Sequence, residues 1–219
     1  MSRSRVLGLI PARGGSKRLP GKNLADLHGR SLLQRAIDAG LEARGIDRLI
    51  VSTDDPAIAE AARAGGAEVP FLRPAELATD EASSLDVVRH AMAWADEDEP
   101  NAFSHLVLLQ PTSPLRTAAD IDQTLTLCRN RGGSTAVSVA PAPKADLLMI
   151  CRNGVLTRAC AYGQPLVLNG AVYVLTWDHL MSGGGFIAPD TACHVMDERR
   201  SVDIDTLGDL ERAGKTLKS

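Results

Sequence analysis

The chain has 219 residues, of which 44% are hydrophobic, and this size and composition are typical of one large α/β domain. A net charge of −3 and an aromatic content of 3% argue against a nucleic-acid partner. The four cysteines have no paired spacing, and no segment matches a signal peptide or a membrane span, so we expect a cytoplasmic protein with free thiols and no membrane partner.

Strands and helices alternate along roughly the first two thirds of the chain. Apolar runs predict strands at residues 6–10, 49–52, 67–71, 106–109 and 135–139, and apolar residues at helical spacing predict helices at 31–44, 57–64, 84–95 and 117–128. This alternation favours an α/β fold with a doubly wound, mostly parallel sheet and right-handed crossovers.

The pattern changes after Ala140. Short strand-like pieces at 148–151 and 155–157 flank Asn153-Gly154, which predicts a hairpin in a small β-rich arm at about 141–168. A return strand at 171–175 and a closing helix at 206–217 follow. The sequence shows no repeat or low-complexity linker, so we expect a single domain over residues 1–219.

The loop after the first strand predicts a polyphosphate site. It reads PARGGSKRLPGKN from Pro11 to Asn23 and carries the cations Arg13, Lys17, Arg18 and Lys22 beside the adjacent glycines Gly14 and Gly15. Glycines let backbone N–H groups approach phosphate oxygens, and cations neutralise them. The spacing matches neither a Walker A loop nor a dinucleotide fingerprint, which Pro20 would interrupt. The alternative is a solvated basic loop.

Polar side chains follow other predicted strands at their carboxyl ends, where open α/β sheets bind ligands. They are found in Ser52-Thr53-Asp54, in Arg73 with Ala82 and Ser84, and in Gln110-Pro111-Thr112-Ser113-Pro114-Leu115-Arg116. The two prolines of the last segment restrict its backbone, so we expect Gln110 to be held rigidly. Alternatively, Ser113-Pro114 only starts the following helix.

Two carboxylates near the C-terminus predict a metal site. If residues 201–206 form a strand, Asp203 and Asp205 share one of its faces and can bind one hard cation. Mg²⁺ held by one or two carboxylates and completed by phosphates is common at nucleotide sites. The alternative is that Asp205 caps the last helix.

Six segments in this order resemble the acylneuraminate cytidylyltransferases (CMP-sialic acid synthetases), over about residues 5–215. They are PARGGSKRLPGKN, Ile50-Val51-Ser52-Thr53-Asp54, the segment from Leu72 to Ala78, the segment from Leu109 to Arg116, Asn169-Gly170-Ala171-Val172-Tyr173 and Val202-Asp203-Ile204-Asp205. The resemblance implies a Rossmann-like nucleotidyltransferase that transfers CMP from CTP to an acidic sugar of the sialic or nonulosonic type, with Mg²⁺ as cofactor and pyrophosphate as product. It also implies a homodimer, formed through the arm.

The resemblance assigns roles to individual residues. It implies catalytic roles for Arg13, Lys22, Gln110 and Asp205, and nucleotide binding by Ala12, Arg13, Gly14, Gly15, Lys22, Asn23, Arg73, Ala82 and Ser84. It implies acceptor binding by Gln110, Asn169, Tyr173 and Phe186, and metal binding by Asp203 and Asp205.

One stretch departs from the family pattern. Relatives commonly carry arginines before the Asn-Gly-Ala segment, but residues 159–168 contain no cation, and Arg158 and Lys144 are the nearest candidates to replace them. Two alternatives therefore stay open. One is cytidylyl transfer to another acidic acceptor, such as an octulosonate or a phosphonate, and the other is a non-catalytic nucleotide-binding regulator.

Overall fold

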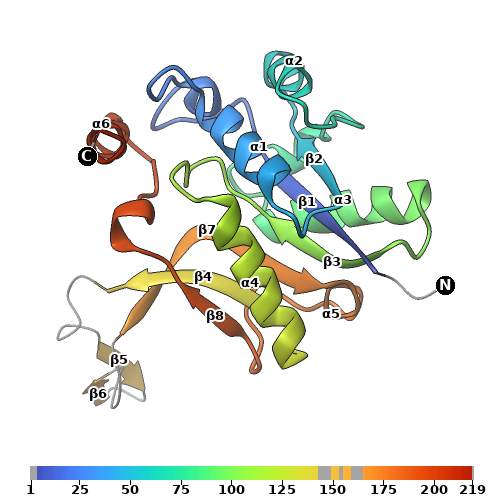
Figure 1. Cartoon of the computed structure of the whole chain (residues 1–219), viewed down its shortest axis with the longest axis vertical. Coiled ribbons are helices and arrows are strands. Elements are labelled where there is room, and N and C mark those ends of the chain that lie inside the picture. The colour runs from blue at the N-terminus through green and yellow to red at the C-terminus, as the bar shows by residue number, and fades with distance from the viewer. Residues whose placement is uncertain (1–3, 143–148, 153–154, 159–164, 219) are drawn as a thin grey trace.

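Six strands form one twisted sheet that runs through the molecule (Figure 1). The structure is a computed structural model that describes residues 4–142, 149–152, 155–158 and 165–218. Across the sheet the strands follow the order β2-β1-β3-β7-β4-β8. Their bounds are β1 Arg5–Pro11, β2 Arg48–Ser52, β3 Phe103–Leu108, β4 Thr135–Pro141, β7 Leu166–Thr176 and β8 Ala192–Val195.

The sheet is mostly parallel, as the alternation of strands and helices predicts. β1 pairs in parallel with both β2 and β3, and β4 pairs in parallel with β8. β7 is the exception, because it lies antiparallel to both of its neighbours, β3 and β4. This strand therefore joins the two parallel parts of the sheet.

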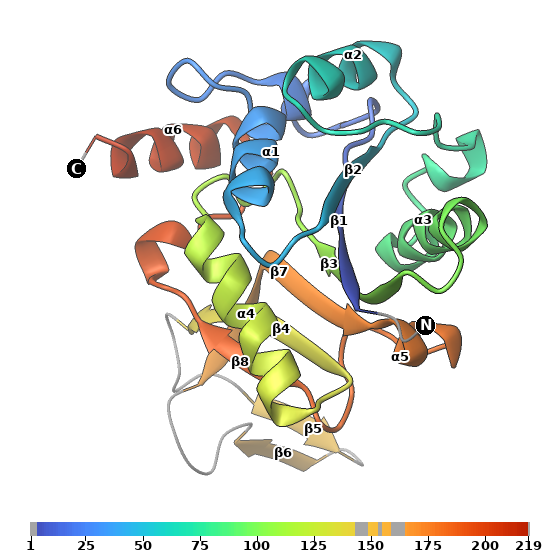
Figure 2. The ribbon, with the colours of Figure 1, turned by 45° about the vertical axis from the view of Figure 1, so that its right-hand side comes forward.

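Helices cover both faces of the sheet (Figure 2). α1, α2 and α4 pack with the sheet in one apolar core, and α3 and α5 pack with it in a second core that contains Phe103 and Trp177. α6 lies beside the first core, where Ala213 packs with Leu27 and Leu32. The bounds are α1 Leu32–Glu42, α2 Pro56–Ala64, α3 Ser84–Asp98, α4 Ala118–Arg131, α5 Trp177–Met181 and α6 Leu207–Thr216.

Each of these helices begins after a residue whose side chain accepts a hydrogen bond from a backbone N–H group of the first turn. These residues are Ser31, Asp55, Ser83, Thr117, Thr176 and Thr206. Such caps satisfy donors that have no partner within the helix, and each stabilises its helix by about 1 kcal/mol. Short polar residues thus fix where the helices start.

Two expectations about local structure were wrong, and two elements were not predicted. Residues 67–71 form no strand and make only isolated bridges, Ile50 with Glu68 and Thr53 with Leu72, because Pro70 has no N–H to give to a ladder. Residues 201–205 are likewise not a strand, although they are extended enough for Ile204 to donate its N–H to the Thr112 carbonyl at 2.8 Å. The predictions also lacked α5 and β8, which are both short.

The predicted hairpin of the arm is present. β5 (Met149–Arg152) and β6 (Val155–Arg158) pair in antiparallel register, while the predicted turn at 153–154 lies outside the described residues. The return strand begins at Leu166, five residues before the predicted start. In the described part of the chain, every helix is too short or too polar to cross a membrane.

Candidate active site

A cavity of about 260 Å³ opens beyond the carboxyl ends of β1 and β3. Pro11 ends β1, and Gln110 comes two residues after β3, so the cavity lies where an open α/β sheet binds its ligands. It brings together predicted site residues that are far apart in the sequence, namely Arg13, Lys22, Asn23, Arg73, Ala82, Ser84 and Gln110. Leu77, Val87 and Thr112 also contribute to its wall.

A second cavity, of about 450 Å³, lies beside the first and is strongly cationic. Its lining includes every cation of the first loop, Arg13, Lys17, Arg18 and Lys22, together with the carboxylates of Asp80 and Asp205. Both cavities include Arg13, Lys22 and Asp80, so these residues lie at the boundary between them. The two cavities therefore form a continuous cleft with a cationic end.

Two carboxylates hold the cationic side chains in place. Asp80 forms an ion pair with Arg13 at 2.6 Å and another with Lys17, and these contacts lower the pKa of its carboxyl, with Lys17 the larger cause. Asp205 pairs with Arg18 at 2.8 Å and with Lys22 at 3.1 Å. The phosphate-loop candidates are thus tied to two other segments of the chain.

The first loop has a defined backbone. Gly21 adopts a φ of +66°, which favours glycine, and it leads into the short 3-10 helix η1 at Lys22–Leu24. Asn23 is buried, and its side-chain amide donates a hydrogen bond to the Arg13 carbonyl at 2.9 Å. This contact joins the two ends of the loop, so it brings Arg13 and Lys22 to the same cleft.

The small residues of the loop have different surroundings. Ala12 is fully buried and hydrogen-bonded to β2 through its backbone. Gly14 packs so tightly that a Cβ atom there would lie 2.6 Å from the Asp55 carboxylate, and its N–H donates to Asp54 at 3.1 Å. A Cβ atom at Gly15 would meet nothing within 4 Å. Gly15 therefore leaves open space, whereas Gly14 is required by close packing.

Arg73 also lines the first cavity and is almost completely buried. Its guanidinium donates to the Ser52 hydroxyl at 3.0 Å, to the Ser52 carbonyl, and to the Leu77 carbonyl at 3.4 Å. Burial lowers the pKa of Arg73 to about 10, so the side chain keeps its charge at neutral pH. Ala82 and Ser84 face it across the cavity.

The loop that carries Gln110 is fixed by an arginine to which sequence reasoning gave no role. The buried Arg116 donates to the Gln110 carbonyl and, at 2.9 Å, to the Ala171 carbonyl of β7. Ser113 does not start a helix, since α4 begins five residues later. The loop is thus held at the cavity, in agreement with the expected rigidity of Gln110. Nothing in the sequence distinguishes Arg116 from an exposed arginine.

Asp203 and Asp205 lie close to each other, and Asp205 lines the cationic cavity. Partial burial and the charge of Asp205 together raise the pKa of Asp203. Asp205 does not cap the last helix, because Thr206 does so in a capping box with Asp209. Among the described residues, no group of three or more His, Cys, Asp or Glu side chains could hold a metal ion. A cation bound here by the protein would therefore have two carboxylates at most.

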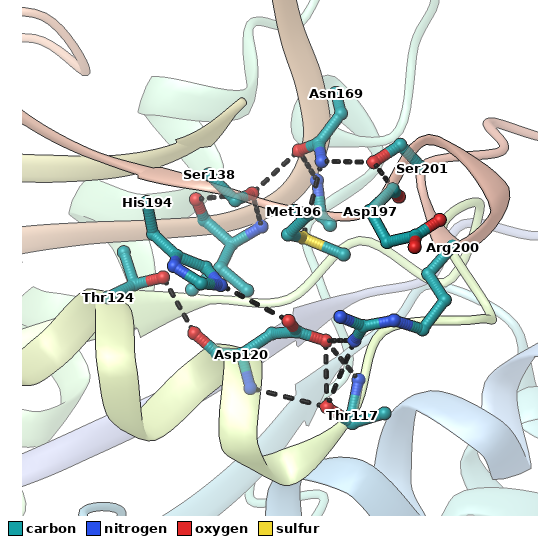
Figure 3. Close-up of polar contacts among 12 residues, drawn as sticks. Thr117, Asp120, Thr124, Ser138, Asn169, His194, Met196, Asp197, Arg200 and Ser201 are labelled. Atoms are coloured by element: carbon teal, nitrogen blue, oxygen red, sulfur yellow. Dashed lines mark hydrogen bonds and ion pairs between the residues drawn. The ribbon is translucent and has the colours of Figure 1, made fainter. Parts of the chain in front are cut away.

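A buried polar network, shown in Figure 3, anchors the segment that precedes these carboxylates. Asp120 of α4 pairs with Arg200 and, at 3.2 Å, with His194 of β8. Asn169 of β7 donates to Ser201 at 3.0 Å and accepts from Ser138 at 2.6 Å. Three elements of the fold thus hold residues 194–201, which lead directly to Asp203.

The predicted acceptor residues do not all reach the cavity. Gln110 lines it, but the Asn169 side chain is buried and hydrogen-bonded at both ends of its amide. The rings of Tyr173 and Phe186 pack against each other with centroids 5.0 Å apart. Burial and the charge of Asp203 raise the pKa of Tyr173, so this ring lies near the carboxylate pair. Lys144 and the Arg158 side chain lie outside the described residues.

The fold and the cleft define a nucleotide-binding α/β protein with its ligand site at the carboxyl edge of the sheet. Residues 7–145 match a family model described as cytidylyltransferase. The chain belongs to the cytidylyltransferase family and is a CTP-dependent nucleotidyltransferase.

Curated relatives resemble almost the whole chain. CMP-N,N'-diacetyllegionaminic acid synthase of Legionella pneumophila is 33% identical, over 92% of this chain and 91% of its own length. N-acylneuraminate cytidylyltransferase of Escherichia coli O18:K1:H7 is 31% identical over 96% of this chain, which spans about half (52%) of that protein. A solved structure of CMP:2-keto-3-deoxy-manno-octonic acid synthetase with CTP superposes with a TM-score of 0.74 at 21% identity, covering 98% of this chain and 99% of that one, and supports the fold.

Proposed function

We propose that this cytidylyltransferase transfers CMP from CTP to an acidic sugar of the nonulosonic type, such as a sialic or legionaminic acid, and releases pyrophosphate. The observation that carries the proposal is the meeting of two cavities, one whose lining includes Arg73, Ala82 and Ser84 and one lined by the loop cations. The names of the two relatives with nearly full coverage of the chain support a nonulosonic acceptor.

The cationic cavity is suited to the triphosphate. We expect Arg13 and Lys22 to bind phosphate oxygens and to stabilise the charge that develops on the departing pyrophosphate. Open space at Gly15 leaves room for a phosphate beside the backbone. Phosphoryl-type transfer depends mainly on positioned cations and in-line geometry, so the site needs no covalent nucleophile.

Asp203 and Asp205 are suited to hold Mg²⁺ with the phosphates. Hard oxygen donors are the ligands that Mg²⁺ prefers, and two carboxylates completed by substrate phosphates and water are a common arrangement. Bound Mg²⁺ would supply charge neutralisation and orientation of the phosphates. Arg18 and Lys22 neutralise Asp205 in the structure. A triphosphate that draws these cations away frees the carboxylate.

Gln110 is the acceptor residue best supported by its position in the cavity wall. We expect its side chain to orient the sugar, with the Tyr173 and Phe186 rings nearby as an apolar surface. Asn169 supports the acceptor side through the backbone it fixes, because its own amide is already occupied. Since the substrate CTP is a cytoplasmic metabolite, we expect the reaction to take place in the cytoplasm.

The proposal is tested by incubating the protein with CTP, Mg²⁺ and single acceptors while pyrophosphate release is measured. The panel contains N,N'-diacetyllegionaminic, N-acetylneuraminic and pseudaminic acids, an octulosonate and a phosphonate. We expect release with at least one nonulosonic acid and little with the last two. Release with the octulosonate or phosphonate alone would replace the proposed acceptor class, and CTP binding without any turnover would favour a regulatory protein.

A further inference from the structure

Asp80 is a carboxylate in the middle of the cationic cleft, and the proposed reaction gives it no role. Its oxygens pair with Arg13 at 2.6 Å and with Lys17, and it lines both cavities. Its side chain is 40% exposed, so solvent and incoming ligands can reach it. An anion in this position occupies the cations that a phosphate would use.

The loop around Asp80 also connects the two ends of the cleft. It follows the 3-10 helix η2 (Ala75–Leu77) and continues to Ala82 and Ser84, which line the first cavity. Arg13 donates a further hydrogen bond to the Thr79 carbonyl at 2.9 Å. Arg13 and the Asp80 loop are therefore joined across the mouth of the cavity.

Asp80 and Asp205 divide the loop cations between them, since Asp205 pairs with Arg18 and Lys22. The two carboxylates respond differently to the arrival of phosphates. Asp205 can exchange its cations for Mg²⁺ under the proposed function, whereas the ion pairs of Asp80 are simply lost. Because no other cation of the described residues replaces Arg13 and Lys17, Asp80 continues to compete with the phosphates for these two side chains.

We propose that Asp80 is the resident counter-anion of the phosphate subsite, a positioning residue that orders Arg13 and Lys17 before CTP binds and competes for them with pyrophosphate afterwards. The inference rests on the proposed function, because it assumes that pyrophosphate is formed in this cleft. Competition from Asp80 lowers the affinity of the cleft for pyrophosphate and speeds its release. The step is an exchange of ion pairs and makes or breaks no covalent bond.

The size of the effect depends on the exposure of the ion pairs. One exposed ion pair changes an equilibrium constant by at most about fivefold. Two such pairs therefore lower the affinity for an anion that needs the same cations by roughly 3- to 20-fold. Loss of a negative charge from the cleft also strengthens the field that attracts an anion. Removal of the Asp80 charge should therefore raise the affinity for pyrophosphate through both effects.

The test is calorimetric titration of inorganic pyrophosphate into the wild type, Asp80→Asn and Glu81→Gln. Glu81 is exposed, and in the described part of the chain it has no ion-pair partner, so its variant removes the same charge one residue away. We expect Asp80→Asn to bind pyrophosphate roughly 3- to 20-fold more tightly, with a steeper salt dependence. Glu81→Gln should stay within about twofold of the wild type.

A second measurement separates competition from a structural effect. If Asp80 acts through Lys17, the gain from Asp80→Asn becomes smaller when Lys17→Gln is already present, since that partner is then absent. Equal pyrophosphate affinities in the wild type and Asp80→Asn would overturn the inference. It would also be overturned if Asp80→Asn gave its full gain in pyrophosphate affinity in the Lys17→Gln background and Glu81→Gln gave the same gain. If the wild type turns over CTP and Asp80→Asn binds pyrophosphate with unchanged affinity, only the role of Asp80 is refuted. If the wild type binds no pyrophosphate, the proposed function is refuted as well.

Discussion

Arg73 illustrates how one residue can serve both the fold and the site. Its guanidinium holds the end of β2 through Ser52 and the η2 turn through Leu77, and Arg73 also lines the first cavity. A buried guanidinium is costly unless its donors are satisfied, and here backbone carbonyls and a hydroxyl satisfy them. We therefore expect loss of Arg73 to lower stability and, under the proposed function, to change ligand choice.

We predict that Arg73→Ala reduces the preference for CTP over UTP by at least about tenfold, because the base loses a fixed cationic neighbour. The variant should also unfold more easily by about 1–3 kcal/mol, since Ser52 and Leu77 lose a donor. Steady-state kinetics with both nucleotides and urea unfolding measure the two effects. An unchanged preference with lowered stability would assign Arg73 to the fold alone.

Asp205 is one of the two carboxylates proposed to bind Mg²⁺. Asp205→Asn should reduce Mg²⁺-dependent turnover by about 100-fold or more, because an amide binds Mg²⁺ poorly while the backbone of the segment is kept. Glu211→Gln is the matched control, as this exposed carboxylate lies on α6. The check is turnover over a range of Mg²⁺ concentrations, and retention of most activity in Asp205→Asn would refute the metal assignment.

At the scale of elements, the buried network anchors an irregular segment to a helix. Burial alone would raise the pKa of Asp120, but hydrogen bonds from Thr117 and His194 and the charge of Arg200 hold it below its usual range. The same carboxylate closes the capping box of α4. The start of α4 and the position of the chain leading to Asp203 are therefore fixed by one side chain.

Asp120→Ala should destabilise the fold by about 3 kcal/mol, because it leaves the half-buried Arg200 and His194 without their partner. It should also raise the Mg²⁺ concentration needed for half-maximal turnover, since the segment proposed to bind Mg²⁺ loses an anchor. Arg199→Ala controls for the loss of a neighbouring exposed charge. A variant as stable as the wild type would show that the network does not anchor the segment.

β3 provides a pH-dependent prediction. Burial, with a smaller effect of Arg129, lowers the pKa of His105 from 6.5 to about 4. The unfolded chain therefore takes up a proton first as the pH falls. The contribution of neutral His105 to the free energy of unfolding is fully present above about pH 6.5. At most about 3 kcal/mol of it is lost between pH 6.5 and 4. Urea unfolding against pH should show this slope in the wild type and a shallower one in His105→Gln.

At the scale of the whole molecule, three consecutive apolar residues remain uncovered. Leu166, Val167 and Leu168 begin β7 with exposed fractions between 37% and 50%, although they pair with the end of β4. A soluble enzyme usually covers a continuous apolar strand, and the family resemblance implies a homodimer. We therefore expect a second copy to bury this strand.

Light scattering after size-exclusion chromatography should give twice the chain mass of 23.2 kDa. Replacing Leu166 and Leu168 together by Asp places charges on one face of the strand and should yield monomers. Leu217→Asp, a change at another exposed leucine, should leave the mass unchanged. A wild type that elutes as a monomer at micromolar concentration would refute the dimer.

Much of the fold was predictable because buried strands have continuous apolar runs and helices begin at short polar caps. The prediction failed where a run is interrupted, as at Pro70, or where no run exists, as in β8. The residues at strand ends predicted which side chains line the first cavity, and their role in nucleotide binding stays a prediction. The partners of Asp80, Arg116 and Asp120 could not be predicted, because each contact depends on the packing of segments distant in sequence.

The antiparallel insertion of β7 between β3 and β4 has a consequence for synthesis of the protein. β4 leaves the ribosome before its central neighbour exists, because residues 166–176 follow it in the chain. Until then β3 has one unpaired edge and β4 has two, because β8 also follows β4 in the chain, and open edges favour aggregation. Fragments that end before β7 should therefore be captured by chaperones or precipitate. In chains that extend past Thr176, β7 can pair with both β3 and β4.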